Sequence, residues 1–263
     1  MSASNPSRSL LLRHNLKSLK LPTMLAEYEK LAREASDANE DYHGYLLRLS
    51  ELELTTRAGN ALMNRIKLAA FPVIKELADF DFTLVPGVNK PAVLELTRSD
   101  WIDRHETACF LGNSGTGKTH LAIAVGLCAC RNGKRVKFTS AATLANQLEE
   151  AQKQYRLERM LRQLERIELL VIDEVGYLSF SRIAAELLFQ VFADRYERGS
   201  ILVTSNLPFD EWAGVFQGER MTAALLDRFT HRCTIIEMNG ESYRFRESAK
   251  SSARKKPAAA DKE

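Results

Sequence analysis

The stretch Cys109–Thr119 reads CFLGNSGTGKT and decides the fold of the chain around it. From Gly112 to Thr119 it fits the pattern G-x-x-x-x-G-K-[ST], whose backbone N–H groups turn inward around phosphate oxygens. Glycines allow this turn because they carry no Cβ. The apolar run Ala108–Leu111 precedes the loop and the helical sequence HLAIAVGLCAC follows it. The stretch therefore predicts a strand, a phosphate-binding loop and a helix.

Several residues of this loop have predicted roles in binding phosphates and Mg²⁺. Lys118 is predicted to reach the β- and γ-phosphates, and the Thr119 hydroxyl is predicted to bind Mg²⁺. The positive end of the helix dipole points at the same phosphates. The predicted nucleotide-binding residues of the loop are Gly112, Asn113, Ser114, Gly115, Thr116, Gly117, Lys118, Thr119 and His120. The loop thus predicts a site for a nucleoside triphosphate and Mg²⁺.

Composition bounds the class of protein. The chain has 263 residues, 45% hydrophobic and 27% charged, enough for one large domain or two modest ones. A net charge of +3 neither favours nor excludes binding to nucleic acid, so a DNA-binding role depends on where the charges lie. Four cysteines without C-x-x-C spacing indicate reduced thiols. With neither a signal peptide nor an apolar run near ~18 residues, we expect a cytoplasmic protein that has no contact with membranes.

Residues 1–78 are predicted to form a small all-helical domain. Helical periodicity covers the region of Leu12 to Leu19, then Thr23–Ala35, then a mostly helical stretch from Tyr42 to about Leu77 with interruptions at Gly59 and Pro72. Basic residues gather at both ends of this region, at Arg8, Arg13, Lys17, Lys20, Arg57, Arg65 and Lys67. They are candidates for DNA contact, although for any single residue a solvated face is the commoner role.

Residues 79–106 differ in pattern from the helical region before them and are predicted to be a linker on the adenine side of the site. Asp79–Pro86 is aromatic and extended, and Pro86-Gly87 is a turn signal. Trp101 or Ile102 is a candidate wall for the base. The alternative is a simply buried aromatic residue, which is more common in linkers.

A second strong signal is Leu169–Glu174, which reads LLVIDE. Four apolar residues predict a strand buried on both faces, and its carboxyl end presents two acids where open α/β sheets bind ligands. Asp173 is placed to hold Mg²⁺ beside Thr119, and Glu174 to polarise an attacking water. A loop opener or a helix cap is the alternative for this acidic pair. The phosphate loop upstream favours the catalytic interpretation.

A further strand, Ile201–Thr204, ends in Ser205-Asn206. The Asn206 amide can hydrogen-bond the γ-phosphate or the attacking water, although asparagine is also a common turn residue. Strand and helix alternate from residue 107 to 206, which predicts an α/β fold with a parallel sheet and helices on both faces.

Four segments occur in this order: GNSGTGKTHLA, LLVIDEVGYL, ILVTSNLPFDEW, and LLDRF followed by GESYR. Together they resemble the AAA+ ATPases of the IstB/DnaC group, and most of all the IstB proteins, ATP-dependent helpers of bacterial insertion-sequence transposases. LKLPTML and RIKLAAFP extend the likeness to the N-terminal region. The resemblance implies a five-stranded parallel sheet in an AAA+ domain at 107–247, after a helical domain for DNA, partner or self-assembly. Residues 248–263 are expected to be a disordered basic tail.

The resemblance also implies roles for single residues. Lys118 and Thr119 match Walker A, Asp173 and Glu174 match Walker B, and Asn206 matches sensor 1. Arg228 in LLDRF matches the arginine finger that acts on a neighbour's nucleotide, with Arg220 as the alternative, and Arg244 matches sensor 2. The implied catalytic set is Lys118, Asp173, Glu174, Asn206 and Arg228.

The function implied by the resemblance is Mg²⁺-dependent ATP hydrolysis in a homo-oligomer with ATP at its subunit interfaces. The oligomer is expected on double-stranded DNA in the bacterial nucleoid, where it recruits or activates the transposase of the same mobile element. The alternative is a DnaC-like loader of a replicative helicase, which binds single-stranded DNA. A second candidate DNA contact is the arginine series Arg156, Arg159, Arg162 and Arg166. Five nearby glutamates balance these four arginines and Lys153, which favours an ordinary solvated helix.

Overall fold

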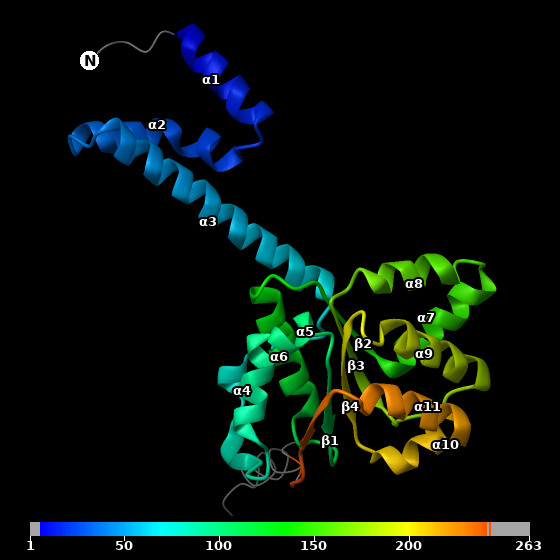
Figure 1. Cartoon of the computed structure of the whole chain (residues 1–263). Helices are drawn as coiled ribbons and strands as arrows, with labels where there is room; N and C mark the ends of the chain where they lie inside the picture. Colours follow the sequence, from blue (N-terminus) through cyan, green and yellow to red (C-terminus); the bar gives the residue numbers. More distant parts are fainter. Residues whose placement is uncertain (1–5, 241, 243–263) are drawn as a thin grey trace, which may run out of the picture. The chain divides into compact units, whose positions relative to one another are not determined.

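The computed structural model describes residues 6–240 and Ser242 (Figure 1). The chain divides into two compact units, Met1–Asn64 and Arg65–Glu263. The division falls inside a helix, because α3 spans Tyr42–Ala69.

The first unit contains α1 (Pro6–Ser18), α2 (Pro22–Asp37) and most of α3. Its small core consists of Leu16, Tyr28, Leu31 and Leu49. Buried Glu53 accepts hydrogen bonds from the backbone N–H groups of Thr23 (2.8 Å) and Met24 (3.0 Å), which have no partner within α2. One carboxylate on α3 thereby caps the start of α2.

The predicted interruption at Gly59 is wrong, because α3 is helical through it. A glycine costs only about 1 kcal/mol in a helix interior, too little to break a strongly helical sequence on both sides of it. The helix ends at Ala69, just before Pro72, where proline would remove a helix hydrogen bond.

The second unit is built on a five-stranded parallel sheet, which confirms the predicted α/β fold. Its strands are β1 (Thr107–Leu111), β2 (Val136–Ser140), β3 (Leu169–Val175), β4 (Ser200–Ser205) and β5 (Cys233–Glu237). The order across the sheet is β2-β3-β4-β1-β5. Since all the strands run in one direction, all of them end at the same edge, and the residues that follow them are neighbours.

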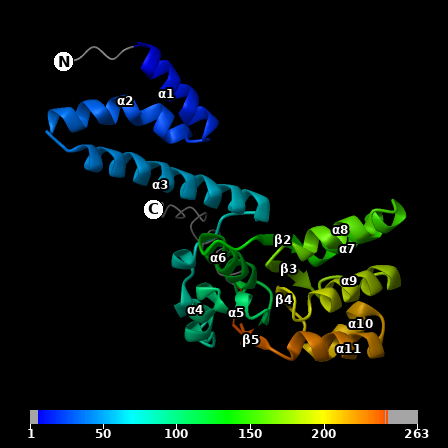
Figure 2. The same cartoon turned by 45° about the horizontal axis from the view of Figure 1, so that its top comes forward.

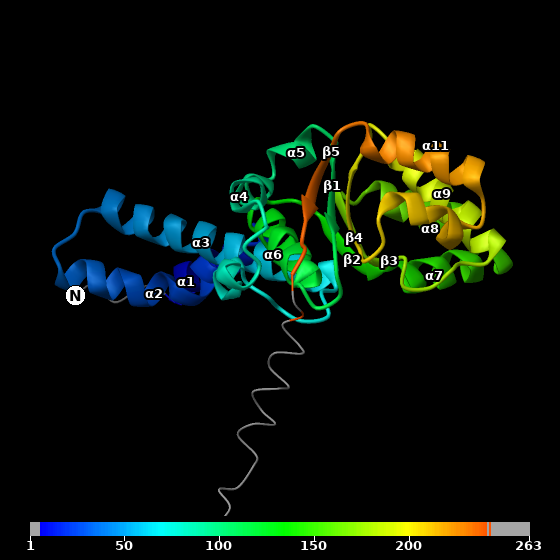
Figure 3. The same cartoon turned by 90° about the horizontal axis from the view of Figure 1, so that it is seen from below.

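Helices cover both faces of this sheet (Figures 2 and 3). One face carries α4 (Lys90–Arg98), α5 (Asp100–Asp103) and α6 (Lys118–Arg131). The other carries α7 (Ala141–Lys153), α8 (Leu157–Glu165), α9 (Arg182–Arg195), α10 (Trp212–Phe216) and α11 (Glu219–Thr230). Short 3₁₀ turns lie at Leu77–Asp79, Phe82–Leu84 and Phe209–Glu211. Ser140 caps α7, accepting a hydrogen bond from the Thr143 N–H.

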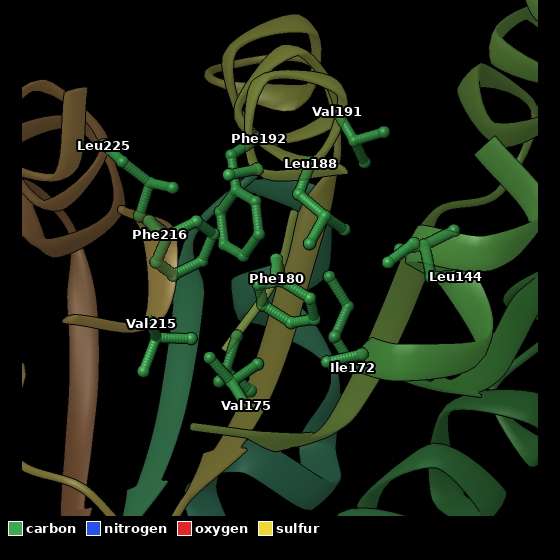
Figure 4. Packing of buried hydrophobic residues seen from close by; sticks show 14 of the residues in the cluster. Leu144, Ile172, Val175, Phe180, Leu188, Val191, Phe192, Val215, Phe216 and Leu225 are labelled. Carbon is green, nitrogen blue, oxygen red and sulfur yellow. The ribbon is translucent and has the colours of Figure 1, made fainter. Parts of the chain in front are cut away.

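The core between the sheet and the second helical layer is rich in aromatic residues (Figure 4). Ile172 and Val175 of β3 pack there with Phe180, and Phe180 lies against Phe216 with ring centroids 5.6 Å apart. Every β3 residue except Glu174 is buried, so the predicted two-sided burial of this strand is confirmed. The strand that presents Asp173 is therefore held rigidly from both sides.

Residues 65–82, which we call the α6 strap, contact α6 near both of its ends. Arg65 Nε donates a hydrogen bond of 2.9 Å to the carbonyl oxygen of Cys130. Further along the strap, the Phe71 ring covers Gly126, where an added Cβ would lie 2.8 Å from Phe71 Cε1. The Glu76 carboxylate pairs with Arg131. The strap therefore covers the helix that leads out of the phosphate loop.

We predict that Gly126→Ala lowers the free energy of unfolding by about 1–3 kcal/mol, because the new methyl group forces the Phe71 ring out of place. Urea unfolding followed by circular dichroism measures the change. Gly214→Ala is the matched control, since Gly214 is also helical and has no atom within 4 Å of an added Cβ. That change should stabilise by roughly 0.5–1 kcal/mol. Equal stabilisation by both changes would contradict the strap contact.

Candidate nucleotide-binding site

The predicted phosphate loop joins the end of β1 to the start of α6. Gly112, Gly115 and Gly117 all have positive φ, at 139°, 79° and 92°. At Gly112 space is also limiting, because a Cβ there would lie 2.3 Å from the carbonyl oxygen of Met238. The loop conformation therefore requires glycine at these positions for the reason that the motif implies.

The Lys118 ammonium lies within the loop. Its Nζ donates hydrogen bonds to the carbonyl oxygens of Gly112 (2.6 Å) and Asn113 (2.7 Å). Lys118 is also the first residue of α6, so its charge adds to the positive end of the helix dipole. Two sources of positive potential thus meet at the loop, as an anion site requires.

Thr119 and Asp173 meet at the carboxyl edge of the sheet. The Thr119 hydroxyl lies 3.0 Å from Asp173 Oδ1 and 3.1 Å from Oδ2. Asp173 is buried, and the hydroxyl of Thr204 in β4 donates a second hydrogen bond to Oδ1 at 2.5 Å. The structure therefore brings together the two residues that the sequence nominated as magnesium ligands.

This pair fits the chemistry of Mg²⁺. The ion prefers oxygen ligands and is commonly held by one or two carboxylates, waters and substrate phosphates. A hydroxyl and a carboxylate at 3.0 Å from each other, next to a phosphate loop, supply ligands of that kind. Ligation by Thr119 and Asp173 stays a prediction.

Glu174 lies near the end of β3 in an unusual backbone conformation. Its φ is 62°, in the left-handed region. The β3–β4 register shifts here, from Ile172 opposite Val203 to Val175 opposite Ser205. This bulge leaves Glu174 exposed while Asp173 stays buried.

The end of β4 also lies beside the loop. The Gly112 N–H donates to the carbonyl oxygen of Ser205 at 3.2 Å, and Asn206 follows directly and is exposed. The structure thus places Asn206 at the same edge of the sheet as Asp173 and Glu174. Its sensor role stays a prediction.

Trp101 and Ile102 lie elsewhere. Both are buried in α5, which precedes the start of β1, whereas the phosphate loop follows the end of β1. The Trp101 indole N–H donates to the carbonyl oxygen of Leu96 at 2.8 Å, a packing role. The prediction that either residue walls the base is therefore wrong, since five residues of strand separate them from the loop.

Phe80 of the α6 strap is the aromatic residue that the structure places against the loop. An added Cβ on Gly117 would lie 2.6 Å from its ring, and its ring centroid lies 5.3 Å from that of His120. His120 Nε2 is also 2.9 Å from the carbonyl oxygen of Glu76. Two strap residues therefore fix the predicted binding residue His120.

Arg228, the predicted arginine finger, falls outside this site. Arg228 lies near the end of α11, next to Phe229, whose carbonyl oxygen accepts a 2.6 Å hydrogen bond from Thr107 Oγ1 at the start of β1. It is thus at the opposite edge of the sheet from the phosphate loop. Arg220 lies in the first turn of α11. Arg244 and the predicted tail 248–263 lie outside the described residues.

Sequence reasoning missed Thr204 and Phe80. Thr204 carried a weak signal, a polar residue near the end of the apolar strand ILVTS. Phe80 carried none that separates it from any partly buried aromatic residue, because its contact depends on the path of the strap.

The sheet order, the phosphate loop and the carboxylates near the end of β3 define an AAA+ ATP-binding protein. Solved structures agree: a replication initiator DnaA bound to AMPPCP and single-stranded DNA matches with a TM-score of 0.55 and 25% identity over 69% of this chain and 56% of that chain. DnaA from Aquifex aeolicus, bound to AMPPCP, has the same fold, with a TM-score of 0.55 at 22% identity over 73% of this chain and 58% of its own.

The family is identified by a match that covers most of the chain. A model of the IstB-like ATP-binding proteins matches residues 14–251, so this chain belongs to that family. A predicted ATP-binding protein of insertion sequence IS5376 from Geobacillus stearothermophilus is 40% identical over 87% of this chain and 91% of its own length. Its counterpart in IS21 of Pseudomonas aeruginosa is 37% identical over 89% of each chain. Within the described residues, no helix is long and apolar enough to cross a membrane.

Proposed function

We propose that this protein hydrolyses ATP with Mg²⁺, assembles with copies of itself on double-stranded DNA, and recruits or activates the transposase of its insertion sequence. The observation that carries the proposal is the meeting of the Lys118 loop, the Thr119–Asp173 pair and exposed Glu174 at one edge of the sheet. Membership of the IstB-like family supplies the insertion-sequence context.

The chemistry divides among these residues by position. Lys118 and the loop N–H groups bind and orient the β- and γ-phosphates. Thr119 and Asp173 hold Mg²⁺, which neutralises phosphate charge when bound. Glu174 is exposed and carries a carboxylate that can accept a proton from water, and Asn206 is placed to orient that water. Buried Asp173 and exposed Glu174 therefore take different tasks although they are adjacent in sequence.

Lys118→Ala and Glu174→Gln are expected to fail at different steps. The first removes a phosphate contact and should weaken ATP binding, whereas the second should leave ATP bound but unhydrolysed, because only the proton-accepting group is lost. Titration with a fluorescent ATP analogue and a phosphate-release assay separate the two effects. Wild-type turnover by Glu174→Gln would overturn its role.

In this proposal Arg228 acts on the nucleotide of a neighbouring copy. The phosphate loop of its own subunit lies beyond the five residues of β1, about 16 Å of extended chain. The two candidate fingers, Arg220 and Arg228, lie about 12 Å apart along α11. A guanidinium supplied by a neighbouring copy stabilises charge on the γ-phosphoryl group and makes hydrolysis depend on assembly.

Arg228 is half-buried, and its surroundings are consistent with contact to a ligand from outside the subunit. It lines a cavity of about 180 Å³ together with Arg104, His105, His231 and Arg232. Arg228 Nη1 donates to the carbonyl oxygen of Ala224 at 2.9 Å and its guanidinium stacks 5.6 Å from the Phe189 ring centroid. These contacts leave further donors of the fork for a ligand from outside the subunit.

We expect Arg228→Ala to retain ATP binding and to lose most hydrolysis, since comparable fingers contribute ~10³–10⁵ in rate. Mixing it with Lys118→Ala should restore part of the activity, because an interface then combines an intact finger with an intact loop. Arg220→Ala is the control and should hydrolyse ATP normally. Failure of every mixing ratio to recover activity would rule out action of Arg228 across an interface.

Exposed basic residues of the N-terminal region support DNA binding. Arg8, Lys17 and Lys20 are exposed, and Arg13 pairs only loosely with Glu29, at 3.6 Å. On α8, Arg162 pairs with Glu158 at 3.6 Å, which favours an ordinary solvated helix for that arginine series. Each subunit offers a small basic surface, and repetition in an oligomer sums many weak phosphate contacts.

We predict ATP-promoted binding to duplex DNA with a log-affinity slope against log salt of roughly −0.9 per neutralised phosphate. Replacing Arg13, Lys17 and Lys20 with alanine should flatten the slope, while replacing Lys30 and Arg33 of α2 with alanine is the control for loss of exposed basic residues elsewhere and should leave the slope nearly unchanged. Fluorescence anisotropy at several salt concentrations measures it. Salt-independent affinity would refute the idea. Binding to single strands and a helicase, but not to duplex, would favour the loader instead.

A further inference from the structure

Thr204 lies at the one irregular point between β3 and β4. It is almost fully buried, at 1% exposure. The register passes from Ile172 opposite Val203 to Val175 opposite Ser205, so Thr204 alone faces both Asp173 and Glu174. This is the two-against-one arrangement of a β-bulge, which commonly re-aims side chains next to active sites.

The Thr204 hydroxyl replaces the backbone pairing that the bulge removes. It accepts a 2.9 Å hydrogen bond from the Glu174 N–H, and it donates its own hydrogen to Asp173 Oδ1 at 2.5 Å. A single hydroxyl thus uses both its acceptor and its donor capacity, on two successive acidic residues. The backbone of one and the side chain of the other are held by the same atom.

The two hydrogen bonds hold the Glu174 backbone and the Asp173 carboxylate, which pairing between the strands does not hold. Glu174 has φ 62°, a conformation that is unfavourable for a residue with a Cβ and persists only where the surroundings impose it. Gly176, two residues later, also has positive φ, at 97°. Asp173 receives hydrogen bonds from Thr119 on one side and from Thr204 on the other, which limits the rotation of its carboxylate.

We infer that Thr204 is a positioning residue for ATP hydrolysis, which directs the Asp173 carboxylate toward Thr119 and holds the Glu174 backbone in the turn that exposes its carboxylate. The inference rests on the proposed function, because it concerns the same site. It assigns Thr204 a role that is distinct from that of Asn206, because Thr204 is buried and acts only through its two acidic neighbours.

The test compares Thr204→Val with Thr204→Ser in the full chain. Valine keeps the shape and loses the hydroxyl, whereas serine keeps the hydroxyl and loses a methyl group. Thr204→Val should lower kcat by about 10–100-fold, the usual effect of losing a partner that orients a ligand of the metal. The KM for ATP should change little, since the phosphate loop is intact. Thr204→Ser should restore most of the rate.

A second readout needs no nucleotide. Hydrogen–deuterium exchange of the Glu174 amide, resolved by NMR, should be faster in Thr204→Val than in wild type, and unchanged in Thr204→Ser. Thr204→Ala, which also lacks the hydroxyl but is smaller, should behave like the valine variant. It provides the comparison if valine impairs folding, and melting temperatures of all the variants identify that case.

The two readouts separate this inference from the proposed function. If wild type does not hydrolyse ATP, the proposed function fails, while amide exchange still decides whether Thr204 holds Glu174. Wild-type exchange of the Glu174 amide in both hydroxyl-free variants would overturn the inference. So would a serine variant as slow in hydrolysis as the valine variant, because the hydroxyl would then not be the group that matters.

Discussion

The hydrogen bonds between Thr119 and Asp173, at 3.0 and 3.1 Å, join parts of the chain that are far apart in sequence. One partner begins the helix after β1 and the other ends β3. They meet because β4 lies between these strands in the sheet and all three end at one edge. The phosphate loop, the bulge at Glu174 and the end of β4 are arranged around this contact. A strand order that moved β3 away from β1 would separate the loop from its carboxylates.

The sequence predicted the parts of the site that depend on local chemistry. The loop glycines and the buried strand of Asp173 can be recognised from residue type and spacing alone, without knowledge of tertiary contacts. Thr204 was missed because its role depends on a register shift between strands. The base wall was placed wrongly at Trp101, because a hydrophobic residue in a connecting segment gives no indication of which end of the sheet it covers.

The two edges of the sheet differ in chemistry. The carboxyl edge carries Asp173 and Glu174 near the phosphate loop, whereas Arg228 and Arg232 line a cavity at the edge where β1 begins. Opposite features on opposite edges suit head-to-tail contacts, in which one surface of a subunit meets a different surface of the next. Such contacts close into rings or extend into helical filaments according to the rotation between subunits.

The α6 strap changes where the ATP-binding unit begins. Phe71 covers Gly126 and Glu76 pairs with Arg131, so residues before position 79 belong physically to the nucleotide-binding unit. A fragment cut at the boundary suggested by composition would uncover the middle of α6 and lose the ion pair between Glu76 and Arg131. A stable ATP-binding fragment therefore has to begin at or before Arg65, within α3.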